Sequence, residues 1–304
     1  MSTVLYVGAV GRSGTTLIER AIGTSPSFVS LGEVVHLWHR GLELNESCGC
    51  GLAFQECAFW SAVADRAFGG WSKLNVEQVR AWQRTVDRNR FIPMLIWPRF
   101  ASASFRTALA GFTGILDQLY TAISEQVDPG VVLVDASKHP SYLFVLRHLR
   151  LHRPRLLHVV RDPRGVAHSW AKVVHRPDGA GDDMERLGAL RASGRWLSHN
   201  LIFQLAGRLS VRRRRLRYDR FVADPAELPR TVGHLTADLG STLPTFDGTT
   251  IYLGLNHTVS GNPMRFTTGP IQVRSDDGWR VSMPRLQRLT VSVLTLPLRL
   301  AYRW

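Results

Sequence analysis

The sequence predicts an α/β fold of three layers, α/β/α, with helices on both faces of a central parallel sheet. A short apolar run, VLYVGAV, is followed at once by a glycine loop, GRSG, and a helical pattern, TTLIERAIG. Two further apolar runs, at 131 to 135 and 156 to 160, are each followed by polar residues and a helical pattern. Strands buried on both faces of a parallel sheet have this continuous apolar character.

The elements of the first half follow in order from the opening strand. The first helix is expected to end at Gly23, and a second β run, FVSL, follows at 28 to 31. Residues 59 to 127 lack strand signals and are rich in Trp, Phe and Arg, which predicts helices that cap the sheet and wall an acceptor site. Their large aromatic residues would line an apolar cleft or form the core of these helices: Trp82, Phe91, Trp97, Phe100 and Phe105.

The second half continues with an amphipathic segment at about 183 to 207 and a helix near 226 to 238. The run Arg212 to Arg215 is interpreted as a solvated loop before a strand, LRYDRF. For the apolar stretch from Pro284 onward we expect core packing, with a membrane-surface or dimer helix as the alternatives. No repeat, linker or boundary divides the chain, so residues 1–304 are predicted to form one domain with a helical cap at about 59–127.

Composition limits the class of protein without choosing its ligand. Hydrophobic residues make up 44% of the chain, enough for a buried core, and no apolar stretch is long enough for a membrane span. Strand-like residues begin by Val4 and leave no room for a signal peptide, so we expect a cytoplasmic protein. The net charge of +14 comes almost entirely from arginine and would attract any polyanion.

Three cysteines lie close together in NESCGCGLAFQECAFW: Cys48, Cys50 and Cys57. An odd number of cysteines without a secretory signal argues against a disulfide framework. With His36 or His39 as a fourth ligand, the spacing does not match a standard zinc site. We therefore interpret the segment as a structural loop and predict no metal ligand, while metal binding and redox switching remain as alternatives.

The glycine loop lacks two parts of a nucleotide triphosphate loop. Ala9 stands where a Walker A sequence has its first glycine, and Thr15 stands where it has its lysine. The remaining GRSGTT can still hold a phosphate with its backbone N–H groups and the following helix N-terminus, with Arg12 as a cation. The alternative is an ordinary turn between a strand and a helix.

A second segment, LLHVVRDPRGVAHSW, also has the residues of an anion site. Arg161 stands at the carboxyl end of a predicted strand, Pro163 opens a helix, and Ser169 follows two turns later. A guanidinium and a hydroxyl in these places can converge on one phosphate. Two separate anion sites imply a ligand with a phosphate at each end.

These motifs together resemble one enzyme family. GRSGTT, VDASKHP, RDPRGVAHS, LRYDRF, HTVSGNPMRF and GWR, over about residues 4 to 280, resemble the sulfotransferases that use 3′-phosphoadenosine 5′-phosphosulfate (PAPS). The cysteine-rich loop ending in CAFW is similar to the bacterial branch. The resemblance implies a P-loop-like phosphosulfate-binding loop. It also implies metal-independent, in-line transfer of a sulfuryl group to an acceptor hydroxyl, with adenosine 3′,5′-bisphosphate (PAP) as product.

The resemblance assigns residues to each end of the donor. The first loop would bind the 5′-phosphosulfate through Arg12, Ser13, Gly14, Thr15 and Thr16. The 3′-phosphate would be held by Arg161 and Ser169, with Tyr218 near the adenine and Arg265 closing over the 3′-phosphate. The family more often has lysine in the first loop, and Arg12 keeps the positive charge.

The transfer needs a cation on the leaving oxygen and a base for the acceptor. Lys138, at a strand exit, is the predicted cation. Glu33 is our first choice of base, since tyrosyl and glycan sulfotransferases have a glutamate at a similar place. His139 is the second, by resemblance to phenol and steroid sulfotransferases. Either residue could instead be structural, and His168 and His257 are interpreted as packing residues, whereas Ser260 could contact the transferred group.

Two other classes of protein remain as alternatives: a small-molecule kinase, and a nonenzymatic basic module that binds nucleic acid or anionic glycans. The first requires ATP and magnesium. The second explains the charge but not the placement of polar residues at strand ends. We therefore expect a small-molecule, carbohydrate or lipid acceptor, no nucleic-acid partner, and a chain that could form a homodimer.

Overall fold

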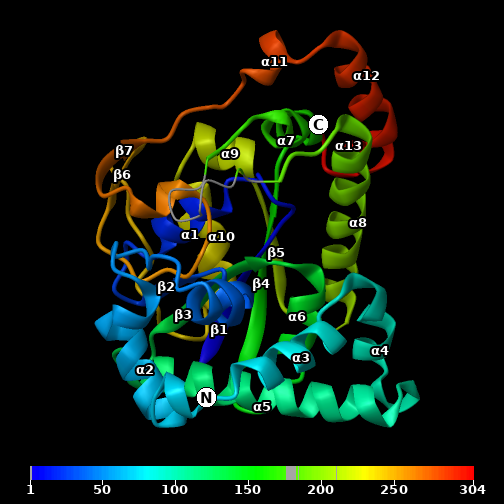
Figure 1. Cartoon of the computed structure of the whole chain (residues 1–304). Coiled ribbons are helices and arrows are strands. Elements are labelled where there is room, and N and C mark those ends of the chain that lie inside the picture. The colour runs from blue at the N-terminus through cyan, green and yellow to red at the C-terminus, as the bar shows by residue number, and fades with distance from the viewer. Residues whose placement is uncertain (1, 176–182, 184, 210) are drawn as a thin grey trace.

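A five-stranded sheet forms the centre of the computed structural model, which describes residues 2–175, 183, 185–209 and 211–304 (Figure 1). The strand order is β2-β3-β1-β4-β5, and all four pairings are parallel. The strands are β1 Thr3–Gly8, β2 Phe28–Gly32, β3 Val132–Lys138, β4 Arg153–Val160 and β5 Arg213–Arg217. The predicted α/β fold with a central parallel sheet is confirmed.

Side chains alternate between the two faces of the sheet and build two separate cores. On β1, Val4 and Tyr6 pack among residues of α5, Ala103–Glu125, and α6, Pro140–Leu146. Leu5 and Val7 point to the other face, among residues of α1, Thr15–Ile22, and α10, Glu227–Thr236. This alternation, with period two along a strand buried on both faces, produces the three layers.

The predicted helical region between β2 and β3 is present. It consists of α2 Ala58–Phe68, α3 Val76–Val86, α4 Ile92–Ile96 and α5. Side-chain oxygens cap two of these helices, since Asn75 accepts from Gln78 N and Ser102 accepts from Phe105 N. Of the aromatic residues expected here, Phe105 is buried and Trp82 and Phe91 pack against the core, whereas Trp97 and Phe100 are exposed.

The arginine run was expected to be a loop, but it forms β5 at the edge of the sheet. The strand ends at Arg217, and the following residues form α9, Tyr218–Ala223, so YDRF is helical. Charged side chains suit an edge strand because one of its sides faces solvent. The Arg215 guanidinium lies 4.6 Å from the centre of the Tyr302 ring, so the run also packs against the C-terminal segment.

The C-terminal stretch is only partly core. The helices α12, Arg285–Leu294, and α13, Leu296–Ala301, lie beside α7, Pro163–Ala171, and α8, Ala189–Arg208 (Figure 1). Val291 and Leu298 are buried there, but Leu286 and Leu300 are 76% and 63% exposed. The expectation of core packing therefore holds for one face of these helices and is wrong for the other.

Two short strands and one short helix lie between α10 and the C-terminal helices. They are a two-stranded antiparallel sheet of β6, Thr250–Leu253, and β7, Gly269–Gln272, and the short helix α11, Trp279–Ser282. No helix among the described residues is sufficiently long and apolar to span a bilayer.

Candidate active site

A cavity of about 440 Å³ opens at the carboxyl ends of β1, β3 and β4. The strands β3 and β4 flank β1, and the connections from β1 to β2 and from β3 to β4 run toward opposite edges of the sheet. Such a change of direction leaves a crevice outside the strand ends, where ligands bind in open α/β sheets. The cavity is lined from separate parts of the chain by Arg12, Thr15, Thr16, Glu33, Lys138, His139, Arg161, Ser169 and Tyr218, among others.

The glycine loop forms one wall of this cavity. Gly14 has φ of +80° and precedes the first turn of α1, whose free backbone N–H groups point out of the helix start. A Cβ atom on Gly14 would lie 2.1 Å from Tyr218 Cε2, so only glycine fits. Arg12, Thr15 and Thr16 line the cavity, but Ser13 does not. The Ser13 hydroxyl is buried without a hydrogen-bond partner among the described residues.

The second predicted anion segment lies against the first. Arg161 follows β4, and its Nη1 donates to Arg12 O at 3.0 Å. Its guanidinium also lies 4.9 Å from the centre of the Tyr218 ring, and its Nη2 donates to Asp276 Oδ2 at 3.0 Å in an ion pair. Ser169, on α7, lines the same cavity. The two segments, about 150 residues apart in sequence, are therefore neighbours in the fold.

Glu33 and Lys138 meet at the exits of the adjacent strands β2 and β3. Lys138 has φ of +66°, and His139 N donates to Ser137 O at 2.8 Å across it. This tight turn directs the Lys138 ammonium to Glu33 Oε1, with which it forms an ion pair. His36 Nε2 lies 3.5 Å from the other carboxylate oxygen. A strained backbone at a strand exit is typical of functional sites.

The pKa values of this cluster follow from burial and charge. Burial would raise the pKa of Glu33, but the Lys138 ammonium, with His36 and Arg40, lowers it to about 2. Burial lowers the pKa of His36 to about 3, although Glu33 opposes the change. In this state Glu33 is therefore a carboxylate and His36 is neutral at physiological pH.

The second candidate base lies in the same cavity. The His139 ring meets His36 edge-on, with ring centres 5.4 Å apart, and its backbone oxygen accepts from the Tyr6 hydroxyl at 2.7 Å. Both residues that the sequence offered as a base are thus present beside the predicted cation.

Several cavity residues were not foreseen from the sequence: His36, Arg40, Trp170, Glu185, Arg195, His199, Asn262 and Met264. Arg195 and His199 are four residues apart on α8, so their common helix face could have been read from the sequence. Arg40 lies on a π-helical segment, Leu37–Glu43, and its Nη1 donates to Ser260 Oγ at 2.7 Å. No sequence pattern indicated that segment.

Two parts of the chain that were expected at the site do not line this cavity. Arg265 was expected to close over a 3′-phosphate, but its side chain is 1% exposed and does not line the cavity. Its guanidinium instead donates to Thr258 O and Ser47 O, at 3.0 and 2.7 Å, which joins two loops. The helical cap at 59–127 contributes no cavity-lining residue among those described, because its apolar side chains are used in the core against the sheet.

Comparisons with known proteins bear on the family and the fold. A family model described as "Sulfotransferase family" matches residues 5–235. Among solved structures, the chain is similar to the "Sulfotransferase Domain from the Curacin Biosynthetic Pathway", with a TM-score of 0.51 and 14% sequence identity over 98% of each chain. No curated protein matches the chain. The comparisons favour neither the kinase nor the basic binding module.

Proposed function

The chain belongs to the sulfotransferase family, and on that premise we propose that it transfers a sulfuryl group from PAPS to a hydroxyl of a small-molecule, carbohydrate or lipid acceptor. One observation carries the proposal: the glycine loop and the segment after β4 line a single cavity, through Arg12, Gly14, Thr15 and Thr16 of the first and Arg161 and Ser169 of the second. A nucleotide with a phosphate at each end would satisfy both.

The 5′-phosphosulfate would bind at the start of α1. The left-handed Gly14 and the first turn of the helix offer backbone N–H donors, and Arg12 and Lys138 supply positive charge. Thr15 and Thr16 would add hydroxyl donors. We assign Ser13 only its backbone N–H because its hydroxyl is buried outside the cavity.

The 3′-phosphate would bind between Arg161 and Ser169, with the adenine beside Tyr218. Arg161 forms an ion pair with Asp276, so a bound 3′-phosphate would replace that carboxylate. The position of Arg161 over the Tyr218 ring would keep the guanidinium oriented during the exchange.

Transfer requires one S–O bond to form and one to break in line. The acceptor oxygen attacks sulfur, and the electron pair of the breaking bond stays on the bridging oxygen of the 5′-phosphate of PAP. Lys138 and Arg12 would stabilise the charge that develops there. The acceptor proton would pass to Glu33.

The ion pair between Glu33 and Lys138 would couple donor binding to base strength. A carboxylate with a pKa of about 2 is a weak base, and it is the Lys138 ammonium that counters the effect of burial. When the donor draws Lys138 toward its phosphosulfate, the burial of Glu33 would raise its pKa. Glu33 would thus accept a proton best when the donor is in place.

The acceptor would enter on the side of Glu33. His36 and Arg40 lie close enough to Glu33 to lower its pKa, so they would contact an acceptor whose hydroxyl reaches that carboxylate. These groups favour a polar acceptor. A cytoplasmic location and a homodimer stay predictions.

Ligand-induced thermal stabilisation tests the donor assignment. In buffer without added metal or chelator, PAP should raise the midpoint of thermal unfolding, because it binds the folded cavity. ATP with magnesium should not reproduce the shift at the same concentration. Stabilisation by ATP with magnesium and none by PAP would contradict the proposal.

A further inference from the structure

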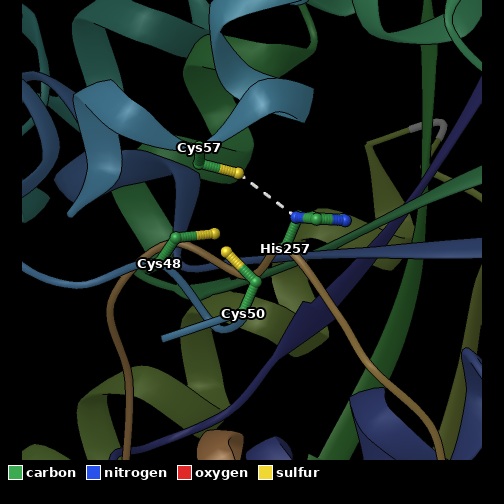
Figure 2. A group of neighbouring side chains, drawn as sticks. All are labelled: Cys48, Cys50, Cys57 and His257. Carbon is green, nitrogen blue, oxygen red and sulfur yellow. Dashed lines mark hydrogen bonds between the residues drawn. The ribbon is translucent and has the colours of Figure 1, made fainter. Parts of the chain in front are cut away.

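Four side chains outside the cavity converge on a common centre. The Sγ atoms of Cys48, Cys50 and Cys57 and a ring nitrogen of His257 all lie within 4.8 Å of one another. Figure 2 shows the three sulfur atoms and the imidazole nitrogen pointing toward the space between them. Cys57 Sγ and His257 Nδ1 are 3.2 Å apart. We propose that these four residues bind one Zn²⁺ ion in a structural site.

The ligand set and spacing fit zinc. Three thiolates and one imidazole form a recognised structural donor set, with Zn–S distances of about 2.3 Å and Zn–N distances of about 2.0 Å. Donor atoms around a tetrahedral ion are then roughly 3.5 to 3.8 Å apart. Contraction of the observed cluster by about one ångström at its widest would achieve this. All four positions are filled by protein, so the ion would be structural and not catalytic.

The backbone around the first three ligands is arranged as a ligand-holding turn. Cys48 N donates to Leu52 O at 2.7 Å, and Gly51 N donates to Cys48 O at 2.8 Å. This turn presents the sulfurs of Cys48 and Cys50 together. Cys57 precedes the first residue of α2, so its position is fixed by that helix.

The histidine ligand is oriented by its own neighbours. The His257 ring stacks on Phe59, with ring centres 5.1 Å apart and an angle of 12°, and Trp60 Nε1 donates to His257 O at 2.7 Å. Contacts of this kind hold a metal-binding imidazole in one orientation. Spacing alone could not pair His257 with the three cysteines, because it lies 200 residues beyond Cys57.

A zinc ion here would join the cysteine loop to the segment that borders the cavity. Gly49 N donates to Thr258 O at 3.0 Å, and Glu33 N donates to Val259 O at 2.7 Å. The buried Arg265 guanidinium donates to the backbone oxygens of Thr258 and Ser47, which adjoin His257 and Cys48 in sequence. Its positive charge would help to balance the net charge of −1 of a zinc site with three thiolates. Binding releases the three thiol protons to solvent, since zinc takes thiolates.

Metal analysis of the full-length chain tests the proposal. Protein purified without chelator should contain about one zinc per chain by mass spectrometry of the metal. His257→Gln should lose the zinc, whereas His234→Gln, which changes an exposed histidine on α10, should keep it. Removal of zinc should lower the midpoint of thermal unfolding, and added zinc should restore it.

A second measurement uses wild-type protein and so does not depend on whether a variant folds. Wild-type protein loaded with Co²⁺ should show the intense visible absorption of a tetrahedral thiolate site. A metal-free, folded wild-type chain that takes up no zinc or cobalt would overturn the proposal, and so would a disulfide among the three cysteines or iron in place of zinc. None of these outcomes bears on PAP binding, so they do not test the proposed function.

Discussion

The two anion-binding segments differ in how they are prepared for a ligand. The loop before α1 offers mainly backbone N–H groups fixed by Gly14, whose conformation and contact with Tyr218 exclude any side chain. The segment after β4 relies on the side chain of Arg161, which is paired with Asp276. The first segment is therefore already arranged to bind an anion, whereas in the second Arg161 must exchange one partner for another.

The two segments would therefore contribute differently to the free energy of nucleotide binding. A preorganised backbone site loses little conformational entropy when its ligand binds. An arginine that leaves one carboxylate for a phosphate gains only the difference between the two interactions. The ion pair of Glu33 with Lys138 is intermediate between these two cases. It is already formed, but Lys138 must move toward the donor before Glu33 can accept a proton.

Glu33, which belongs to neither anion-binding segment, should have the strongest influence on turnover. Glu33→Gln should lower turnover by roughly 10²- to 10⁴-fold, because the acceptor proton loses its base. The affinity for PAP, by calorimetry, should stay the same, since both binding segments remain. Glu77→Gln, at an exposed position on α3, is the matched control. Near-normal turnover in Glu33→Gln would transfer the role to His139.

A substitution at Gly14 should disrupt anion binding by the loop before α1. Gly14→Ala puts a Cβ against the Tyr218 ring and strains a left-handed backbone, so we expect PAP affinity to fall about 100-fold. Gly114→Ala is the control, because a Cβ there meets nothing within 4 Å. Titration calorimetry measures both. Equal affinities would show that the α1 loop does not hold the phosphate.

The segment after β4 should bind PAP more tightly when the carboxylate that pairs with Arg161 is removed. Asp276→Asn should tighten PAP binding by about two- to fivefold, since Arg161 no longer has to leave an ion pair of a partly exposed carboxylate. Asp277→Asn removes a neighbouring charge that pairs with Arg280 instead. An unchanged or weaker affinity in Asp276→Asn alone would argue against partner exchange.

A smaller effect, on the pH dependence of stability, is expected from α1, the helix that follows the glycine loop. Burial raises the pKa of Glu19, on α1, to about 8, from 4.5 in the unfolded chain. The folded chain therefore keeps this proton longer, and stability falls as pH rises from about 4.5 to 8. Glu19→Gln should raise the midpoint of thermal unfolding by a few degrees at pH 9 and by nothing at pH 4. A constant difference across this range would contradict the buried protonated state.

Much of the fold and part of the site could be predicted because they depend on local pattern. Continuous apolar runs marked β1, β3 and β4, and the polar residues after them marked the edge at which Arg12, Lys138 and Arg161 meet. The neighbouring positions of β2 and β3 then explain why Glu33 reaches Lys138.

The rest depends on contacts that no local pattern encodes. Arg265 and His257 act through partners about 200 residues away, so their surroundings could not be read from spacing. The arginine run forms an edge strand because β4 offers it a partner, which overrides the loop-like composition. The exposed face of α12 and α13 likewise reflects tertiary position and not the apolar sequence.

One binding comparison tests whether the two segments bind opposite ends of one nucleotide. The affinities of PAP and of adenosine 5′-monophosphate are measured by calorimetry for wild type, Arg161→Ala and the exposed control Arg191→Ala. Arg161→Ala should weaken PAP roughly 10- to 100-fold, as loss of a charge-assisted hydrogen bond predicts, and leave the monophosphate unchanged. An equal loss of affinity for both ligands, or no loss for PAP, would show that Arg161 does not hold the 3′-phosphate.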